Sequence, residues 1–78
     1  METMESKIID MITELQPYVE FDANTNLLEE DVLDSVSALV LIQELEEEFE
    51  VTIDAEEITE ENLKTVENIL NLVKSKLK

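Results

Sequence analysis

The stretch from Ser35 to Phe49 constrains the fold more than any other part of the chain. It contains neither proline nor glycine, and Asp34, the residue before it, is a preferred N-cap. This pattern predicts a long helix. Its apolar residues cover more than one helical face: Val36, Leu39, Val40, Leu41, Ile42, Leu45 and Phe49. One apolar stripe is enough to pack a helix on a core. The remaining apolar surface is therefore either buried by a second element or left for a partner.

A first and a last helix are predicted by apolar residues at three- and four-residue spacing. Pro17 ends the first helix, and Thr65 is a suitable N-cap for the last. The first stripe consists of Met4, Ile8, Met11, Ile12 and Leu15, and the last of Val66, Ile69, Leu70, Val73 and Leu77. Lys74, Lys76 and Lys78 suit the negative end of the last helix dipole.

A fourth, shorter helix is expected over Ala55–Ile58, because Asp54 with Glu57 three residues on resembles a capping box. Val51–Ile53 is too short to predict a strand. We therefore expect an all-α fold, a small four-helix bundle of three longer helices and one short helix. The 78 residues allow a single domain, residues 1–78, with one modest core. The chain has no cysteine and therefore no disulfide.

Residues 18–33 form a long connection between the first two predicted helices. Its turn-forming residues are Asp22, Asn24 and Asn26, and its expected anchors in the core are Tyr18, Phe21, Leu27, Leu28 and Leu33. A loop of this length in a small domain is often functional. Asp22, Asn24 and Asn26 also match the first ligands of an EF-hand loop. The glycine and the glutamate that complete such a loop are replaced by Leu27 and Leu33, so turn chemistry is the better interpretation.

The charge of the chain excludes several classes of partner and chemistry. Twenty-one acids against five lysines give a net charge of −16, which repels nucleic acid and anionic membranes and attracts basic protein surfaces. Without histidine, cysteine or arginine the chain has no general base near neutral pH and no thiolate, so we expect no enzyme activity. No metal site is expected. No signal peptide or membrane span is evident, which predicts a cytoplasmic location. We also expect a monomer.

Asp34-Ser35-Val36 marks the junction of the long loop and the second helix. The first turn of a helix presents unpaired backbone N–H groups and a partial positive charge, both favourable for a phosphodiester. A serine at this place is exposed. The alternative is that Asp34 or Ser35 only caps the helix.

Three spaced motifs together resemble the acyl and peptidyl carrier protein family. They are LLEEDVLDSV over residues 27–36, LEEEF over residues 45–49 and ITEENLKT over residues 58–65, and the resemblance extends from about Ile8 to Leu77. Family members carry a modified serine after an aspartate at the head of their second helix. The VLDS pattern is similar to that of D-alanyl and other stand-alone aminoacyl carriers.

The resemblance implies a function that needs no catalytic group in this chain. Ser35 would receive 4′-phosphopantetheine from coenzyme A through a phosphopantetheinyl transferase, and Asp34 would help to position the hydroxyl. The thiol of the arm would hold an acyl or aminoacyl group as a thioester. An adenylating ligase or an acyltransferase would load it, and downstream acyl-using enzymes would take it, in fatty acid, polyketide or nonribosomal peptide biosynthesis or in another pathway.

Two departures from the family pattern matter. Asp31 stands where relatives of the VLDS type have glycine, so the backbone there is expected to need an αL-like angle, which Asp tolerates. Ser37 and Val40 stand where fatty-acid carriers have acids, which argues against general fatty-acid enzymes as partners.

The expected partner-binding face lies on the second helix beside Ser35, and consists of Val36, Leu39, Val40, Gln43, Glu44 and Glu47. Val40 could instead point into the core. Two other functions remain open from the sequence: an unmodified acidic helical adaptor and a weak calcium-binding module.

Overall fold

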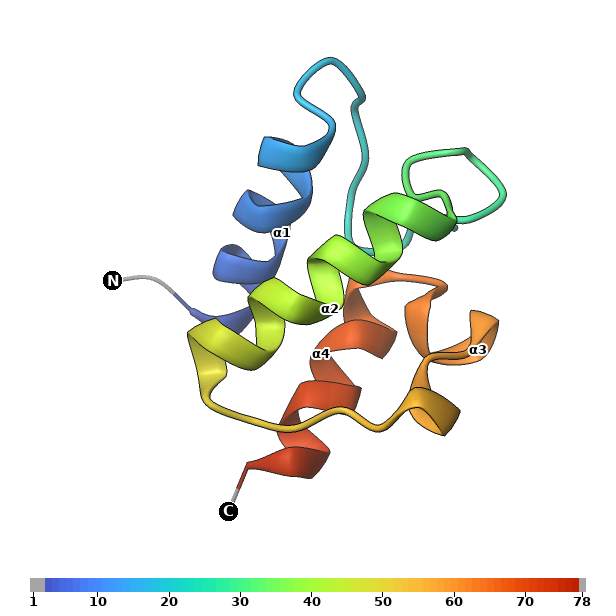
Figure 1. Ribbon diagram of the computed structural model, residues 1–78. Coiled ribbons are helices and arrows are strands. Elements are labelled where there is room, and N and C mark those ends of the chain that lie inside the picture. The colour runs from blue at the N-terminus through green and yellow to red at the C-terminus, as the bar shows by residue number, and fades with distance from the viewer. Residues whose placement is uncertain (1–2, 78) are drawn as a thin grey trace.

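Helices connected by loops make up the computed structural model, which describes residues 3–77 (Figure 1). The helices are α1 (Met4–Leu15), α2 (Ser35–Phe49), α3 (Glu60–Leu63) and α4 (Val66–Lys76), with a 3₁₀ turn at Ala55–Glu57 before α3. Within residues 3–77 there is no strand, and no helix is long and apolar enough to cross a membrane. The all-α bundle with three longer helices and one short helix is confirmed.

The core lies between α1, α2 and α4, because α1 packs against both of the others. Its helical residues recur every three or four positions: Ile8 and Ile12 from α1, Ala38, Leu41, Ile42 and Leu45 from α2, and Val66, Ile69, Leu72 and Val73 from α4. Leu72 was not predicted, whereas Leu77, which was, is 40% exposed at the end of α4. No polar residue among those described is buried, so the core is held by apolar packing alone.

Polar side chains fix where the helices begin. Asp34 Oδ1 accepts the Ser37 N–H at 2.8 Å, and Thr65 Oγ1 accepts the Asn68 N–H at 3.0 Å, which confirms both predicted N-caps. Thr3 caps α1 in the same way through the Ser6 N–H. At the other end of α4, Lys74 and Lys76 lie in the last turn, and Lys78 lies outside the described residues.

The short helix lies later in the chain than expected. Ala55–Glu57 forms only a 3₁₀ turn, in which the Glu57 carboxylate accepts the Asp54 N–H at 3.1 Å as the capping box predicts. Ile58 and Thr59 then leave the helical region, and Thr59 caps the single α-helical turn of α3 through the Asn62 N–H. The predicted short helix at Ala55–Ile58 is present only as the three-residue 3₁₀ turn Ala55–Glu57, and an α-helical turn forms only after the threonine cap at residue 59.

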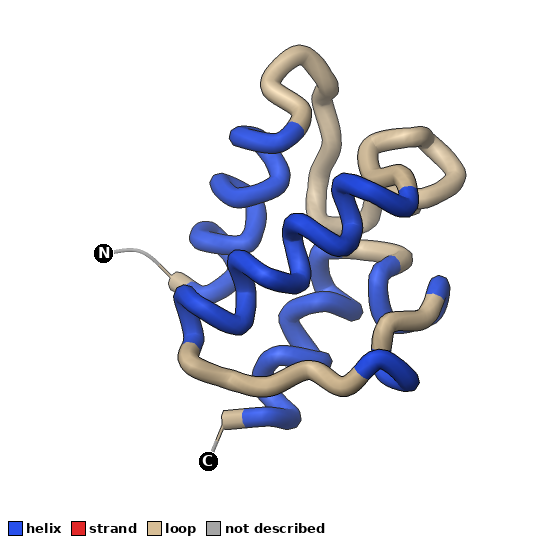
Figure 2. The backbone as a smooth tube through the Cα atoms, viewed as in Figure 1, coloured by secondary structure: helices blue, strands red, loops and turns tan. Residues whose placement is uncertain are grey.

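Residues 16–34 form the long loop, drawn in tan between α1 and α2 (Figure 2). Leu27 and Leu33 are buried as predicted, Phe21 and Leu28 are partly buried against the core, and Val32 is an additional, unpredicted anchor. The Leu27 N–H donates to the Lys64 carbonyl at 2.7 Å, which ties the loop to the segment between α3 and α4. Tyr18 is 98% exposed, so its assignment as an anchor is wrong. It follows Pro17 at the start of the loop, before the chain turns back to the core.

Candidate functional site

Ser35 is the first residue of α2, and its side chain is exposed. Asp34 is the N-cap of α2, so the Ser35 hydroxyl does not cap the helix. Among the described residues, that hydroxyl has no hydrogen-bond partner. The site therefore presents an accessible oxygen nucleophile at the positive end of a helix dipole.

Asp34 is held in place by the first turn of α2. Its Oδ1 accepts the Ser37 N–H at 2.8 Å and the Ser37 hydroxyl at 3.0 Å, and Gln16 Nε2 donates to the same hydroxyl at 3.4 Å from the end of α1. Donation from the Ser37 N–H, and then from its hydroxyl, holds the pKa of Asp34 below the ordinary 3.8. A fixed, ionised carboxylate thus lies next to Ser35 at neutral pH.

The replacement of Asp34 by asparagine should separate this charge from the cap geometry. An asparagine can still accept the Ser37 N–H, but it cannot carry the negative charge that the helix dipole favours. Because the pKa of Asp34 is lower in the folded state, its stabilisation is complete above the unfolded pKa and is lost as pH falls through the folded pKa. We expect wild type to exceed Asp34→Asn in free energy of unfolding above about pH 5, with the difference shrinking toward pH 2.

Urea titrations of both proteins at a series of pH values measure that difference. Protonation of the other carboxylates is common to both chains and largely cancels in the comparison. A difference that stays constant with pH would show that the charge on Asp34 contributes nothing.

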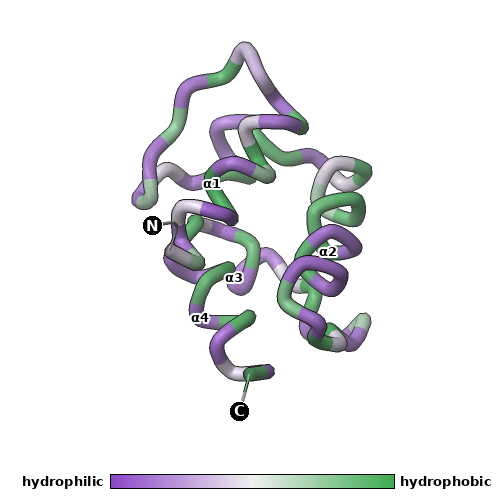
Figure 3. Tube along the Cα trace, turned by 90° about the vertical axis from the view of Figure 1, so that its left-hand side faces the viewer, coloured by the Kyte–Doolittle hydropathy of each residue, from purple (hydrophilic) through white to green (hydrophobic). Residues whose placement is uncertain are grey.

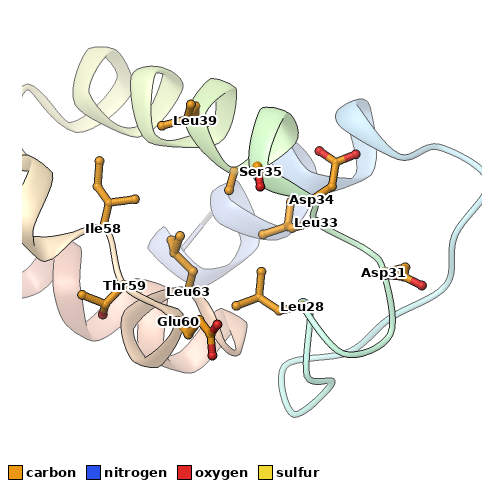
Figure 4. A pocket seen from close by; sticks show the side chains of 11 residues that line it. Leu28, Asp31, Leu33, Asp34, Ser35, Leu39, Ile58, Thr59, Glu60 and Leu63 are labelled. Atoms are coloured by element: carbon orange, nitrogen blue, oxygen red, sulfur yellow. The ribbon is translucent and has the colours of Figure 1, made fainter.

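An open pocket of about 500 Å³ lies beside Ser35, between the head of α2, the loop and α3 (Figure 4). Apolar side chains from all three segments line it: Leu28, Leu33, Ala38, Leu39, Ile58 and Leu63. Asp31, Asp34, Thr59 and Glu60 also line it, and in Figure 4 the Asp31 and Asp34 side chains point away from the leucines. The sequence motifs contain most of these residues, but they give no sign that Leu28 and Leu63 meet beside Ser35, since only the tertiary fold joins the loop to α3.

Asp31 has the αL-like backbone expected of the position where relatives have glycine. Its φ is 58°, and its N–H donates to the Leu28 carbonyl at 3.4 Å. The turn directs the chain from Leu28 to the buried Val32 and Leu33, so it shapes the pocket wall. The chain has no glycine, and Asp is among the residues that adopt this angle at the lowest cost.

The predicted partner-binding residues lie on the outer side of α2. Val36 is 71% exposed, Leu39 53% and Val40 36%, while Gln43 and Glu47 are exposed and Glu44 is half-buried. Val40 is therefore not a core residue, because the inner side of the helix is occupied by Ala38, Leu41, Ile42 and Leu45. The exposure of most of the predicted partner-binding residues agrees with a docking role for this side of α2, which stays a prediction.

Two of the three residues that resemble EF-hand ligands, Asp22 and Asn26, have a side-chain oxygen engaged in a turn. Asp22 Oδ1 accepts the Asn24 N–H at 2.9 Å, and this hydrogen bond is the main cause of a lowered Asp22 pKa. Asn26 Oδ1 accepts the N–H groups of Leu28 and Glu29. These bonds are the Asx-type turn chemistry expected from the sequence.

The model of the family described as "Phosphopantetheine attachment site" matches residues 6–73. The chain belongs to this family. It is 35% identical over 75 residues to proteins named D-alanyl carrier protein from Lactococcus lactis subsp. cremoris strain MG1363 and subsp. lactis strain IL1403. Each alignment covers 94% of this chain and 95% of the relative. No solved structure matched the chain.

Family membership makes the chain a carrier protein and not an enzyme, with 4′-phosphopantetheine as its covalent prosthetic group. The described residues fit such a group. Attachment requires an accessible hydroxyl, and the exposed Ser35 provides one beside an open pocket. When bound, the group would supply a thiol that could hold a cargo as a thioester.

Proposed function

We propose that Ser35 bears the 4′-phosphopantetheine arm and that the chain delivers an aminoacyl group, D-alanine first among the candidates, to partner enzymes. The observation that carries the assignment is the exposed hydroxyl of Ser35 at the head of α2, within a family defined by an attachment site. The cargo is suggested by the relatives' names and by the VLDS pattern. We propose that the chain acts in the cytoplasm as a monomer.

The other serines are poorer acceptors. The Ser37 hydroxyl donates to Asp34 and accepts from Gln16, and the Ser75 hydroxyl donates to the Leu72 carbonyl at 2.6 Å. Ser6 is partly buried near the start of α1. Only Ser35 combines an exposed hydroxyl with the positive end of α2 and the pocket.

In the attachment step, Ser35 Oγ forms a phosphodiester bond and gives up its proton, while 3′,5′-ADP leaves from coenzyme A. The chain has no histidine, cysteine or arginine to activate the hydroxyl, so the transferase must do this. Asp34 is ionised and fixed by Ser37, so it holds a negative charge next to the Ser35 hydroxyl. We propose that it helps to position that hydroxyl during transfer.

Intact-mass measurement tests both parts of the proposal. Incubation with coenzyme A and a broad-specificity phosphopantetheinyl transferase should add one arm per chain. A D-alanine-adenylating ligase with ATP should then add one D-alanyl group to the modified chain only, in a bond that hydroxylamine cleaves. L-Alanine is the matched control and should load poorly.

The possible outcomes separate the candidate functions. A chain that never gains the arm is an unmodified adaptor and not a carrier. A chain that gains the arm but accepts L-alanine or an acyl group in preference to D-alanine is a carrier for a different cargo.

A further inference from the structure

A chain of hydrogen bonds reaches the Asp34 carboxylate from the end of α1. Gln16 Nε2 donates to Ser37 Oγ at 3.4 Å, and the Ser37 hydroxyl donates to Asp34 Oδ1 at 3.0 Å. The Ser37 N–H donates to the same oxygen at 2.8 Å. The Ser37 hydroxyl therefore uses its one proton on Asp34 and accepts from Gln16, so its orientation is set from both sides.

Ser37 is the only side chain in the first half of α2, after Ser35, that can make this bond. From Val36 to Ile42, every residue other than Ser37 has an aliphatic side chain. In Figure 3, α2 is mostly green, the hydrophobic colour, near its start. The Asp34 side chain is exposed, whereas Ser37 and Gln16 are partly buried. Two partly buried side chains thus restrain a carboxylate that lies in water, and no neighbour on α2 can replace the hydroxyl.

Capping of the helix does not require the hydroxyl or Gln16. The Ser37 N–H alone completes the N-cap of α2. The hydroxyl adds a second donor to the same oxygen, Oδ1, and neither bond uses Oδ2. Two donors that approach one oxygen from different directions restrict the rotation of the carboxylate more than one donor does. Orientation of the carboxylate is therefore what the additional bonds contribute.

We propose that Ser37 and Gln16 are positioning residues for attachment of the arm: they hold the Asp34 carboxylate in one orientation beside Ser35 and so raise the rate of transfer, without touching the transferred group. This inference rests on the proposed function. Transfer requires Ser35 Oγ to approach the phosphorus atom within a narrow range of geometries, and small displacements near the reacting atoms lower the rate. A carboxylate free to rotate would also bring its charge toward the phosphate, which carries charge of the same sign.

Steady-state kinetics of arm transfer test this inference. The chain is the varied substrate of the phosphopantetheinyl transferase, coenzyme A is saturating, and intact mass measures the rate. Ser37→Ala keeps the backbone N–H and should take the arm to completion, but with kcat lowered about twofold to tenfold, the range that one hydrogen bond contributes. The KM for the chain should change by less than about twofold, because Ser37 does not bind the transferase. Gln16→Ala should lower kcat less, since its bond is long at 3.4 Å.

Two matched variants separate positioning from a general loss of stability. Ser37→Thr retains the hydroxyl and should restore the wild-type kcat. Thr13→Ala also removes a hydroxyl, one that donates to the Ile9 carbonyl at 2.8 Å on α1, and should leave kcat unchanged. Melting curves establish that every variant is folded at the assay temperature. A purely structural role for Ser37 would lower the melting temperature of Ser37→Ala and leave its kcat at the wild-type value.

A double-mutant cycle shows whether Ser37 acts through Asp34. Asp34→Gly removes the carboxylate, and glycine at an N-cap costs little stability. This variant should have a lower kcat than wild type. Adding Ser37→Ala to it should then change kcat by less than about twofold, because the group that Ser37 positions is gone. An equal loss from Ser37→Ala in both backgrounds would show that Ser37 acts independently of Asp34.

That result overturns the inference. It is equally overturned if Ser37→Ala or Asp34→Gly keeps the wild-type kcat, if Ser37→Thr does not restore kcat, or if Thr13→Ala lowers kcat as much as Ser37→Ala. Failure of the proposed function gives a different result. In that case the wild-type chain does not gain the arm at Ser35, which refutes the inference together with the carrier function.

Discussion

Ser35→Ala should abolish attachment of the phosphopantetheine arm and leave the fold unchanged. The substitution removes the only oxygen that we assign as acceptor. It removes no core packing, because Ser35 is exposed and Asp34 makes the helix cap. The free energy of unfolding should therefore stay within about 0.5 kcal/mol of wild type. The first effect is measured as the intact mass of the variant, under conditions in which the wild type is completely modified. Urea unfolding measures the second effect.

Ser37→Ala is the control for this experiment. Ser37 lies two residues further along the same helix, and its hydroxyl bonds to both Asp34 and Gln16. We expect this variant to accept the arm, with a small loss of stability. If Ser35→Ala still gains the mass of the arm, the attachment site lies elsewhere and our assignment is wrong.

Leu27→Ala should strongly destabilise the fold. Its side chain is fully buried, and truncation of a buried leucine costs about 2–5 kcal/mol. A domain of this length is expected to have about 4–12 kcal/mol in total, at about 0.05–0.15 kcal/mol per residue. The melting temperature should therefore fall by at least about 8 °C, since each kcal/mol corresponds to about 4–8 °C in a domain of this size.

Tyr18→Ala is the comparison within the same loop. Tyr18 is 98% exposed, so its removal should change the free energy of unfolding by no more than about 0.5 kcal/mol. Thermal unfolding followed by circular dichroism measures both variants. Equal destabilisation by the two substitutions would contradict the packing described for the loop.

Local features of the sequence determined most of the secondary structure. Asp34 and Thr65 are residue types that accept a backbone N–H at the start of a helix, and Pro17 cannot continue one, so the start of α2, the start of α4 and the end of α1 were predicted correctly. The αL angle at Asp31 was predicted as well, from the position at which relatives have glycine. The candidate serine was indicated by its place after the α2 cap and by the resemblance of three spaced motifs to the carrier protein family.

Where several local signals competed, the sequence was insufficient. Asp54 and Thr59 are both good caps, and the spacing of residues does not show which one starts a true helix. In the structure the residues after Asp54 form only a 3₁₀ turn, and the α-helical turn follows Thr59.

Only the tertiary structure decided which apolar residues are buried. Tyr18 and Leu27 are equally plausible anchors from sequence, but Leu27 is buried beside the Lys64 backbone and Tyr18 remains in water. Likewise, Val40 is left outside because Ala38, Leu41, Ile42 and Leu45 already fill the inner side of α2. The pocket beside Ser35 exists because the loop and α3, distant in the chain, meet at the head of α2. Burial depends on the side chains that surround a residue in space, and a residue's own type and neighbours in sequence do not determine these.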